Sequence, residues 1–518
     1  MTELLERGLA ALREDRYAEA EAALLEVLTL DPACPDALGM LGHLYMRRLQ
    51  FDTALDYFNE ALRRGGHVAG LHANRAGALL ALGRYDAALA AARRAAALEP
   101  DSFVRAADVL FVLNQDPTVT PEQLHAEHRA VAARFLDPVP HLEIPRSRLA
   151  DPERRLRIGY ISGDFRDHAV AFFIEPLLAH RDRAAFEVLC YQTIGKEDAR
   201  TQRWRALADA WYDVSGTSDE ALAHAILDHR VDILVDLAGL TRGGRTLALA
   251  RRPAPVQVSY LGYLGTTGSR AFDYRVTDAL ADPPGTADAF HTERLARLPR
   301  TLWCFAPWAD MPAPAMRPEP NDAPVVFGSF NRLTKIHPDL VSLWARLLER
   351  VPRSELWILD VPSDEARAAL LAPFRERGIA ESRVITLPRQ LRADYWQTIR
   401  RADIALDPFP YNGGATTCEC LYLGVPVVTR AGALGFARSG ASILGNVGLR
   451  ELVAESDAQY LEIAAALAND RQRLRALQRG LRARMQASPL MDAPGFLRDL
   501  EDAYRDMWRR ACASTSRP

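Results

Sequence analysis

The sequence of 518 residues predicts an α + α/β protein, in which a helical repeat region is followed by two Rossmann-like α/β halves. A repeat of fixed period occupies the N-terminal part, and two later series of short apolar runs alternate with helical stretches. Proline-rich segments separate these parts. At roughly 150 residues per domain, the length allows about three domains. Hydrophobic residues make up 48% and charged residues 25%, the proportions of a globular protein in water.

The N-terminal repeat has a period of 34 residues. Aromatic side chains recur at this step, each followed three residues later by an alanine: Tyr17, Phe51 and Tyr85, with Ala20, Ala54 and Ala88. Further positions keep the same register: Gly8, Gly42 and Ala76; Leu24, Phe58 and Ala92; Pro32, Gly66 and Pro100. A small residue lets two helices approach closely while the aromatic fills the space beside it. The pattern resembles tetratricopeptide repeats, each a helix-turn-helix.

Stacked helix pairs of this kind form a concave surface that usually holds a peptide or a partner protein. We therefore expect a protein or peptide partner for the repeats, although three repeats would equally serve as a rigid cap on the next domain. The helical pattern continues to Phe135, with interruptions at Pro117 and Pro121. We assign residues 1–135 to the helical region and the proline-rich residues 136–152 to a linker.

The rest of the chain divides into two α/β halves, predicted at 153–306 and 324–510 and joined by a proline-rich linker at 307–323. Apolar runs that read as strands occur at 156–162, 186–192, 231–239 and 256–262, and again at 325–330, 355–361, 384–388, 402–408 and 425–432. Strands alternating with helices favour a parallel sheet. Ligands bind at the carboxyl ends of the strands in such sheets, so the following loops should carry the site.

Four of these loops are polar or rich in glycine. Residues 163–168 hold Asp164, Asp167 and His168, residues 260–269 are rich in glycine and threonine, and residues 331–338 carry Lys335. In residues 409–417, glycines and threonines precede a helix, where free backbone amides and the helix dipole favour a phosphate. Neither the ATPase P-loop pattern nor a G-x-G-x-x-G after a strand is present, which argues against an ATPase and a dehydrogenase.

Charge and cysteine usage exclude several other classes. The 64 basic side chains nearly cancel the 67 acidic ones, so the chain has no general attraction for nucleic acid or anionic membranes. The six cysteines form no C-x-x-C pair and fit a reducing cytoplasm. The N-terminus lacks the apolar core of a secretory signal, and no apolar stretch reaches the about 18 residues of a membrane span. Only two lysines occur, Lys196 and Lys335.

Four blocks follow one another along the α/β region: GYISGDFRDHAVAFF, RRPAPVQVSYLGYLGTTG, FGSFNRLTKIHP and LDPFPYNGGATTCECLYLGVPVVT. They look like the signature blocks of the protein O-GlcNAc transferase and SPINDLY family, glycosyltransferase family 41, whose members also begin with tetratricopeptide repeats. The resemblance implies a GT-B fold. It further implies an inverting, metal-independent transfer of GlcNAc from UDP-GlcNAc to Ser or Thr hydroxyls of proteins, with no cofactor.

The leaving diphosphate is the first part of the predicted site. Its growing charge must be neutralised by a metal or by fixed cations and amides. No D-x-D occurs in the chain, which favours fixed groups. The resemblance implies that Lys335 contacts the diphosphate and that the turn Ala415, Thr416 and Thr417 adds amides and hydroxyls. Without the resemblance, Lys335 would read as a surface lysine at a strand-helix junction.

The acceptor hydroxyl is the second part. His168 matches the catalytic-site histidine of the family, and Asp164 stands four residues upstream, the spacing of one helical turn. Either group could handle the proton of the acceptor, and transfer assisted by the donor's own phosphate is a third option. The alternative is that Asp164 caps the following helix and His168 only hydrogen-bonds the sugar.

The nucleoside is the third part. By resemblance, Tyr395 stacks on the base, Arg392 is a neighbouring basic contact and Glu419 holds the ribose hydroxyls. The other nucleotide-sugar contacts implied are Gly262, Arg332 and Tyr411.

Some residues depart from the family pattern: Leu240, Leu264, Arg332 and Tyr411. Tyr411 is larger than the cysteine that the animal enzymes have beside the N-acetyl group, so UDP-glucose or GDP-fucose is the alternative donor. Two other functions stay open, an inactive repeat scaffold that only binds nucleotide and an enzyme for small-molecule acceptors. The joint presence of His168, Lys335 and Glu419 favours an active enzyme.

Overall fold

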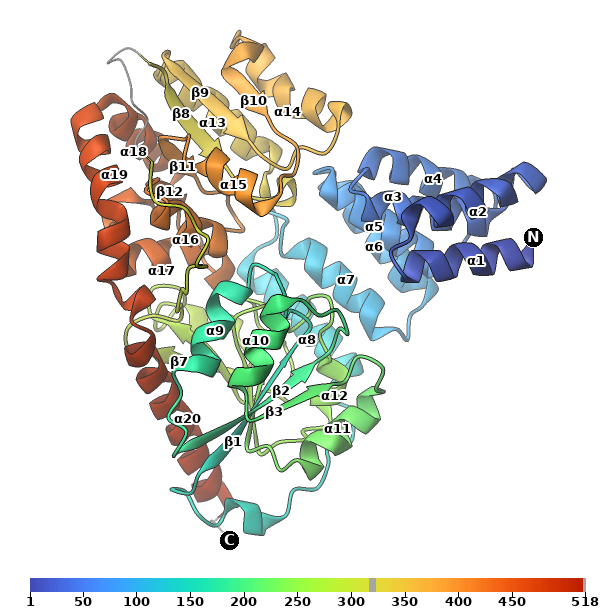
Figure 1. The fold of residues 1–518 in the computed structure, drawn as a ribbon, viewed down its shortest axis with the longest axis vertical. Coiled ribbons are helices and arrows are strands. Elements are labelled where there is room, and N and C mark those ends of the chain that lie inside the picture. The colour runs from blue at the N-terminus through green and yellow to red at the C-terminus, as the bar shows by residue number, and fades with distance from the viewer. Residues whose placement is uncertain (316–322, 516–518) are drawn as a thin grey trace. The chain divides into compact units, whose positions relative to one another are not determined.

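The structure is a computed structural model that describes residues 1–315 and 323–515 (Figure 1). Its internal packing divides the chain into two compact units. The repeat-containing unit comprises residues 1–119 and 326–391, and the larger unit comprises residues 120–325 and the described chain from 392 onward. The predicted linker at 307–323 lies partly outside the described residues, and the predicted domain boundaries stay predictions.

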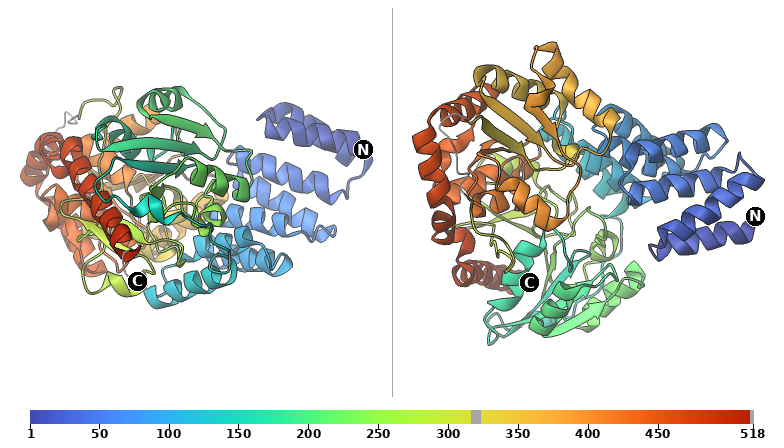
Figure 2. Two further views of the ribbon diagram at one scale, coloured as in Figure 1. Left: turned by 90° about the horizontal axis from the view of Figure 1, so that it is seen from below. Right: turned by 45° about the horizontal axis from the view of Figure 1, so that its top comes forward.

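The repeat-containing unit begins with three helix pairs, followed by α7 (Phe103–Leu113). The pairs are α1 (Thr2–Arg13) with α2 (Tyr17–Leu30), α3 (Pro35–Arg47) with α4 (Phe51–Arg63), and α5 (Ala69–Ala81) with α6 (Tyr85–Leu98). Consecutive helices lie side by side, as Figure 2 shows. Each repeated aromatic is the first residue of the second helix of its pair, which confirms the predicted helix-turn-helix repeat.

The small residues of the repeat lie where helices meet. The repeated alanines Ala20, Ala54 and Ala88 are fully buried. A Cβ at Gly8 would lie 2.9 Å from the Leu24 side chain, and a Cβ at Gly42 would lie 2.5 Å from the Phe58 ring. The repeat therefore pairs a glycine on the first helix with a large side chain on the second. The third repeat has alanine at both positions.

The same unit contains a second segment of alternating strands and helices. It consists of β8 (Val325–Ser329), η3 (Leu333–Lys335), α13 (Pro338–Arg350), β9 (Ser354–Ile358), α14 (Asp364–Glu376), η4 (Glu381–Arg383) and β10 (Val384–Thr386).

The larger unit begins with α8 (Pro121–Phe135), whose Thr120 forms a capping box with Gln123. The elements that follow are η1 (Arg146–Leu149), β1 (Leu156–Ser162), α9 (Ala171–Ala179), β2 (Phe186–Gln192), α10 (Ala199–Leu207), β3 (Ala210–Asp213), α11 (Asp219–Asp228), β4 (Ile233–Asp236), α12 (Thr246–Ala250), β5 (Val256–Ser259), β6 (Tyr274–Asp278), η2 (Ala287–Phe290) and β7 (Arg294–Leu298).

The larger unit ends with α15 (Arg392–Ile399), β11 (Ile404–Leu406), α16 (Ala415–Tyr422), β12 (Val427–Arg430), η5 (Gly435–Ala437), α17 (Ser439–Asn446), η6 (Arg450–Leu452), β13 (Val453–Ala454), α18 (Asp457–Asn469), α19 (Arg471–Gln486), η7 (Pro489–Met491) and α20 (Ala493–Thr515). The long helix α20 packs against β5, β7 and α9.

The strands form two sheets with doubly wound order, β3-β2-β1-β4-β5-β6-β7 and β10-β9-β8-β11-β12-β13. Every pairing within the first sheet is parallel. The predicted fold class is thereby confirmed, because each apolar run of the sequence contains a strand. Four strands were not predicted: β3, β6, β7 and β13.

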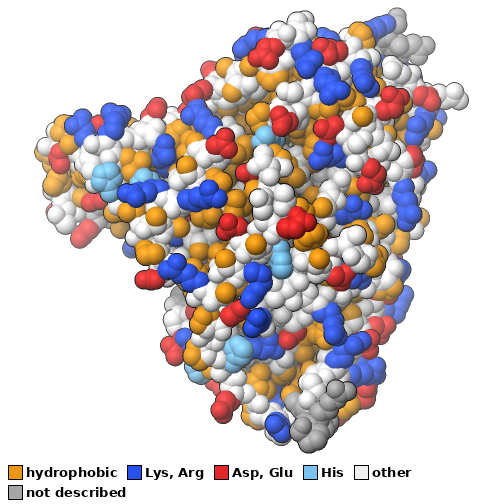
Figure 3. Space-filling model, turned by 180° about the vertical axis from the view of Figure 1, so that it is seen from behind, with side chains coloured by type: hydrophobic (Ala, Val, Ile, Leu, Met, Phe, Trp, Pro, Cys, Tyr) orange, Lys and Arg blue, Asp and Glu red, His pale blue; other side chains and the backbone are white. Residues whose placement is uncertain are grey.

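The surface is mixed in charge. On the face drawn in Figure 3, basic side chains are interspersed with acidic ones. No helix within residues 1–315 and 323–515 has both the length and the apolar character needed to cross a membrane.

We expect Gly42→Ala to destabilise the repeats by about 1–3 kcal/mol, because the added Cβ overlaps the Phe58 ring in a packed interface. Urea denaturation measures the change. Gly70→Ala on α5 is the control, because nothing lies within 4 Å of its Cβ and alanine has the higher helix propensity. Adding Phe58→Ala to Gly42→Ala recreates the alanine pair of the third repeat and should remove the overlap. Equal stability of Gly42→Ala and the parent chain would contradict this packing.

Candidate active site

The strand order of the first sheet places β1 and β4 side by side, where the chain winds in opposite directions, which is where such sheets bind ligands. The loops after β1, β4 and β5 therefore lie at one edge. Gly262, in the loop after β5, approaches the loop after β4 so closely that a Cβ there would overlap the carbonyl oxygen of Leu237. Glycine is required at position 262 because any side chain would separate the two loops.

The loop after β1 brings Asp164 and His168 together. Asp164 is 7% exposed, and its Oδ2 lies 3.5 Å from His168 Nδ1, while Oδ1 lies 3.3 Å from Arg166 Nη2. The alternative that Asp164 caps the next helix is wrong, because α9 begins at Ala171 after Val170 and has no side-chain cap. Residues 163–170 form bends and turns, so the four-residue spacing is not a helical turn.

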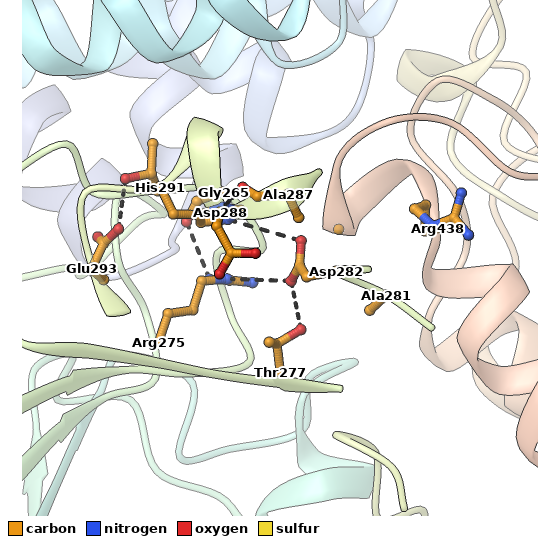
Figure 4. Close-up of polar contacts among 12 residues, drawn as sticks. Gly265, Arg275, Thr277, Ala281, Asp282, Ala287, Asp288, His291, Glu293 and Arg438 are labelled. Carbon is orange, nitrogen blue, oxygen red and sulfur yellow. Dashed lines mark hydrogen bonds and ion pairs between the residues drawn. The ribbon is translucent and has the colours of Figure 1, made fainter. Parts of the chain in front are cut away.

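A buried charged group supports the glycine-rich loop after β5 (Figure 4). Arg275 on β6 is 1% exposed, and its Nη1 donates to the carbonyl oxygens of Tyr263 at 2.9 Å and Gly265 at 3.1 Å. Asp282 Oδ2 lies 4.0 Å from Arg275 Nε, and Asp282 Oδ1 lies 4.0 Å from His291 Nε2. This group fixes the backbone beside Gly262. Sequence reasoning missed Arg275, because β6 was not recognised as a strand.

The loop after β11 is anchored by Asp407. Its Oδ1 accepts from the Gly413 amide at 2.7 Å, and its Oδ2 accepts from Thr429 Oγ1 at 2.7 Å. In the same loop the Tyr411 ring stacks on Phe436, with centroids 5.1 Å apart and planes inclined by 16°. Burial raises the pKa of Tyr411 to about 12. The aromatic side chain at position 411 is thus held by a neighbouring ring.

The N-terminus of α16 follows this loop at Gly414. Ala415 and Thr416 are half-buried, whereas Thr417 is buried and its hydroxyl donates to the Gly413 carbonyl at 3.0 Å. The Thr416 side chain is hydrogen-bonded to Tyr395. The amides of the first turn have no partners within the helix and are available to an anion.

Glu419 is a buried carboxylate on α16, 4% exposed. Its Oε1 accepts from Trp396 Nε1 at 2.8 Å and lies 3.9 Å from Arg392 Nη1, and Tyr395 also hydrogen-bonds to it. Burial raises the pKa of Glu419 to about 7, against the opposing effects of Trp396, Arg392 and Tyr395. The structure therefore brings together three residues predicted to hold a nucleoside, on the neighbouring elements α15 and α16.

Arg392 connects this cluster to the loop after β1. Its Nη2 donates to Asp167 Oδ1 at 2.5 Å, and its guanidinium lies 3.8 Å from the centroid of the Trp308 ring. The guanidinium of Arg200 lies 3.3 Å from the same ring system. Sequence reasoning placed Trp308 in a linker and gave no role to Asp167.

Arg332 and Lys335 belong to the repeat-containing unit, on the loop between β8 and α13. Arg332 is exposed, and Lys335 is half-buried at the end of η3. Asp360 follows β9 with φ of +64°, and the Leu333 amide donates to it. Burial raises the pKa of Asp360, while the nearby guanidinium groups of Arg389 and Arg332 lower it. Sequence reasoning missed Asp360 and Arg389.

Within the described ranges, no three His, Cys, Asp or Glu side chains are grouped so that they could share a metal ion. The positive charges near the site residues described above belong to arginine and lysine side chains.

Known proteins similar to this chain come from plants, an animal and a bacterium. It is 40% identical over 427 residues to SPINDLY of Solanum lycopersicum, named as a probable UDP-N-acetylglucosamine–peptide N-acetylglucosaminyltransferase, covering 80% of this chain and 45% of that protein. SPINDLY of Arabidopsis thaliana, with the same name, is 39% identical over 422 residues, covering 80% of this chain and 46% of that protein. The chain thus spans less than half the length of these curated relatives.

A solved structure covers almost the whole chain. The O-GlcNAc transferase of Thermobaculum terrenum, solved as a lysine-to-methionine mutant, is 36% identical with a TM-score of 0.93, covering 99% of this chain and 98% of that chain. The tetratricopeptide repeat model matches residues 4–34 and 69–102. The model of glycosyl transferase family 41 matches residues 135–311 and 314–500. On this match, which spans both parallel sheets, the chain belongs to glycosyl transferase family 41.

Proposed function

We propose that this chain is an inverting, metal-independent protein O-glycosyltransferase that moves GlcNAc from UDP-GlcNAc to Ser or Thr hydroxyls. The observation that carries the proposal is the buried Glu419 carboxylate in the middle of α16, hydrogen-bonded by Trp396 and Tyr395 and close to Arg392. A buried acid beside an aromatic ring and a cation suits a nucleoside, because the acid accepts both ribose hydroxyls and the ring stacks on the base. Family membership supports this reading.

The diphosphate would lie at the start of α16. The amides of Ala415, Thr416 and Thr417 meet one phosphate there, where the helix dipole also favours an anion. Lys335 supplies a compact positive charge to the diphosphate, and Arg332 adds to the nucleotide-sugar contacts. These groups neutralise the charge that grows as the sugar leaves, so the reaction needs no metal and no cofactor.

The transfer step is a displacement at the anomeric carbon. The acceptor oxygen forms a bond to that carbon while the bond from the carbon to the diphosphate oxygen breaks, which inverts the configuration. The hydroxyl proton passes to His168, to Asp164 or to a phosphate oxygen of the donor. Asp164 and His168 lie close enough to act together, and the backbone of Gly262 in the loop after β5 would contact the nucleotide sugar.

The acceptor would be a protein or peptide held by the repeats, because stacked helix pairs of this kind form a concave surface. We infer that the protein works in the cytoplasm, because its six cysteines are buried and none is in a disulfide.

A second donor is favoured by Tyr411. Its ring is larger than the cysteine expected beside the N-acetyl group, and stacking on Phe436 limits its movement away. UDP-glucose or GDP-fucose would then replace UDP-GlcNAc on the same machinery.

A donor panel tests the proposal. We expect nucleotide release from UDP-GlcNAc that rises when a protein lysate is added, and weaker release from UDP-glucose and GDP-fucose. Preference for GDP-fucose would favour the second donor, and Tyr411→Cys should then shift the preference towards UDP-GlcNAc. Release from none of the three would overturn the proposal and support a scaffold that only binds nucleotide.

We expect Lys335→Met to lower kcat by about 100-fold or more, because it removes a fixed cation from the leaving diphosphate. The other lysine of the chain is the matched control, since Lys196 is exposed in a polar loop. Lys196→Met should keep full activity. Circular dichroism checks that both variants fold, and an active Lys335→Met would refute the assigned diphosphate contact.

Donor affinity should depend on the ionisation of Glu419, whose pKa burial raises to about 7. The carboxyl is protonated below this pKa and can no longer accept both ribose hydroxyls. We therefore expect UDP-GlcNAc to bind up to about tenfold more weakly at pH about 6 than at pH about 8, measured by calorimetry. Glu419→Gln should bind weakly with a flat profile. Asp394→Asn, which removes an exposed acid from α15, should keep the parent profile.

A further inference from the structure

The loop that carries Lys335 is tied to the third helical repeat. The loop runs from the end of β8 at Ser329 to the start of α13 at Pro338, and both belong to the same compact unit as the repeats. We propose that Tyr85 of the third repeat is a positioning residue for Lys335, so that the repeats are part of the transfer machinery as well as a surface for acceptors. This inference rests on the proposed role of Lys335.

Tyr85 contacts the loop on both sides of Lys335. Its hydroxyl donates to the carbonyl oxygen of Thr334 at 3.0 Å. Its ring lies against the His337 ring, with centroids 5.1 Å apart and planes inclined by 38°. Thr334 directly precedes Lys335 and His337 follows two residues later, so the backbone that aims the lysine is fixed at two points by one side chain.

Burial of Tyr85 and contacts of the neighbouring residues hold it against the Lys335 loop. Tyr85 is 7% exposed, and burial raises the pKa of its phenol, so the hydroxyl keeps its proton and stays a donor. Helix α5 packs against η3, and Arg84 forms an ion pair with Glu365 on α14.

The remainder of the loop is held by its own α/β segment. The Leu333 amide donates to Asp360 at the start of the loop, and His337 Nδ1 accepts from the Asp339 amide at 3.4 Å as the cap of α13. The segment thus fixes the two ends of the loop, while Tyr85 bonds to the peptide between them. Removing that bond should loosen Lys335 without unfolding either part.

The Tyr85 hydroxyl is not required by the repeat itself. The equivalent position is Phe51 in the second repeat, which has no hydroxyl, and Tyr17 in the first, whose hydroxyl donates to Asp15 at 2.8 Å. The ring is what the repeats share. The Tyr85 hydroxyl therefore acts outside the repeat, by its hydrogen bond to the loop of the α/β segment.

The test uses the full chain and measures donor hydrolysis without any protein acceptor. If the repeats only hold acceptors, a change in them leaves this reaction unaltered. We expect Tyr85→Phe to lower kcat for hydrolysis about tenfold with little change in donor KM, because a displaced Lys335 stabilises the leaving diphosphate less well. The melting temperature should stay close to that of the parent chain.

Tyr17→Phe is the matched control, because it makes the same change at the same repeat position and should leave hydrolysis unaltered. A second variant, His337→Asn, keeps a good cap for α13 but removes the ring contact, and it should also lower kcat. In a Lys335→Met background, Tyr85→Phe should have no further effect.

The outcomes separate this inference from the proposed function. Absence of nucleotide release by the parent chain both with and without a protein lysate would overturn the proposed function. If the parent chain turns over and Tyr85→Phe matches Tyr17→Phe, the positioning role is wrong. Equal losses from Tyr85→Phe in the parent and Lys335→Met backgrounds would also overturn it, because the hydroxyl would then act on something other than the lysine.

Discussion

Burial of the Glu419 carboxylate is the constraint on which the nucleotide end of the larger unit depends. A buried carboxylate is costly unless hydrogen bonds and a nearby cation offset the loss of water. Trp396 and Tyr395 supply the hydrogen bonds from one helix, and Arg392 supplies the cation. Arg392 is in turn bonded to Asp167, in the loop that carries His168. One buried charge therefore fixes the relation between α15, α16 and the loop after β1.

The fold could be predicted from the sequence because a parallel strand that is buried on both faces consists of a continuous run of apolar residues. Runs such as 156–162 and 186–192 coincide with β1 and β2 residue for residue. The strands that were not predicted lack such a continuous apolar run. In β7 two arginines stand among leucine and alanine, and β6 contains Arg275, whose charge is compensated by Asp282 beyond the end of the strand. A buried arginine reads as a surface residue until its partners are known.

Residues of the candidate site could be predicted where they lie in one segment of the sequence. They could not be predicted where the fold brings separate segments together. Asp164 and His168 share one loop, and Glu419 lies within the block LDPFPYNGGATTCECLYLGVPVVT. Trp308 comes from a proline-rich stretch without periodicity, yet its ring contacts Arg392 and Arg200. Nothing in the local sequence of Trp308 indicates these contacts, because the tertiary fold creates them.

The repeats illustrate how one position can serve two constraints. The aromatic ring at the start of each second helix fills the space beside a buried alanine, and phenylalanine or tyrosine satisfies this equally. Packing therefore does not determine whether the ring at this position carries a hydroxyl. In the third repeat, whose helix α5 packs against η3, the Tyr85 hydroxyl donates to the Thr334 carbonyl oxygen. The aromatic ring is therefore common to the three repeats, whereas the hydroxyl, present in Tyr17 and Tyr85 and absent from Phe51, follows the contacts of each repeat.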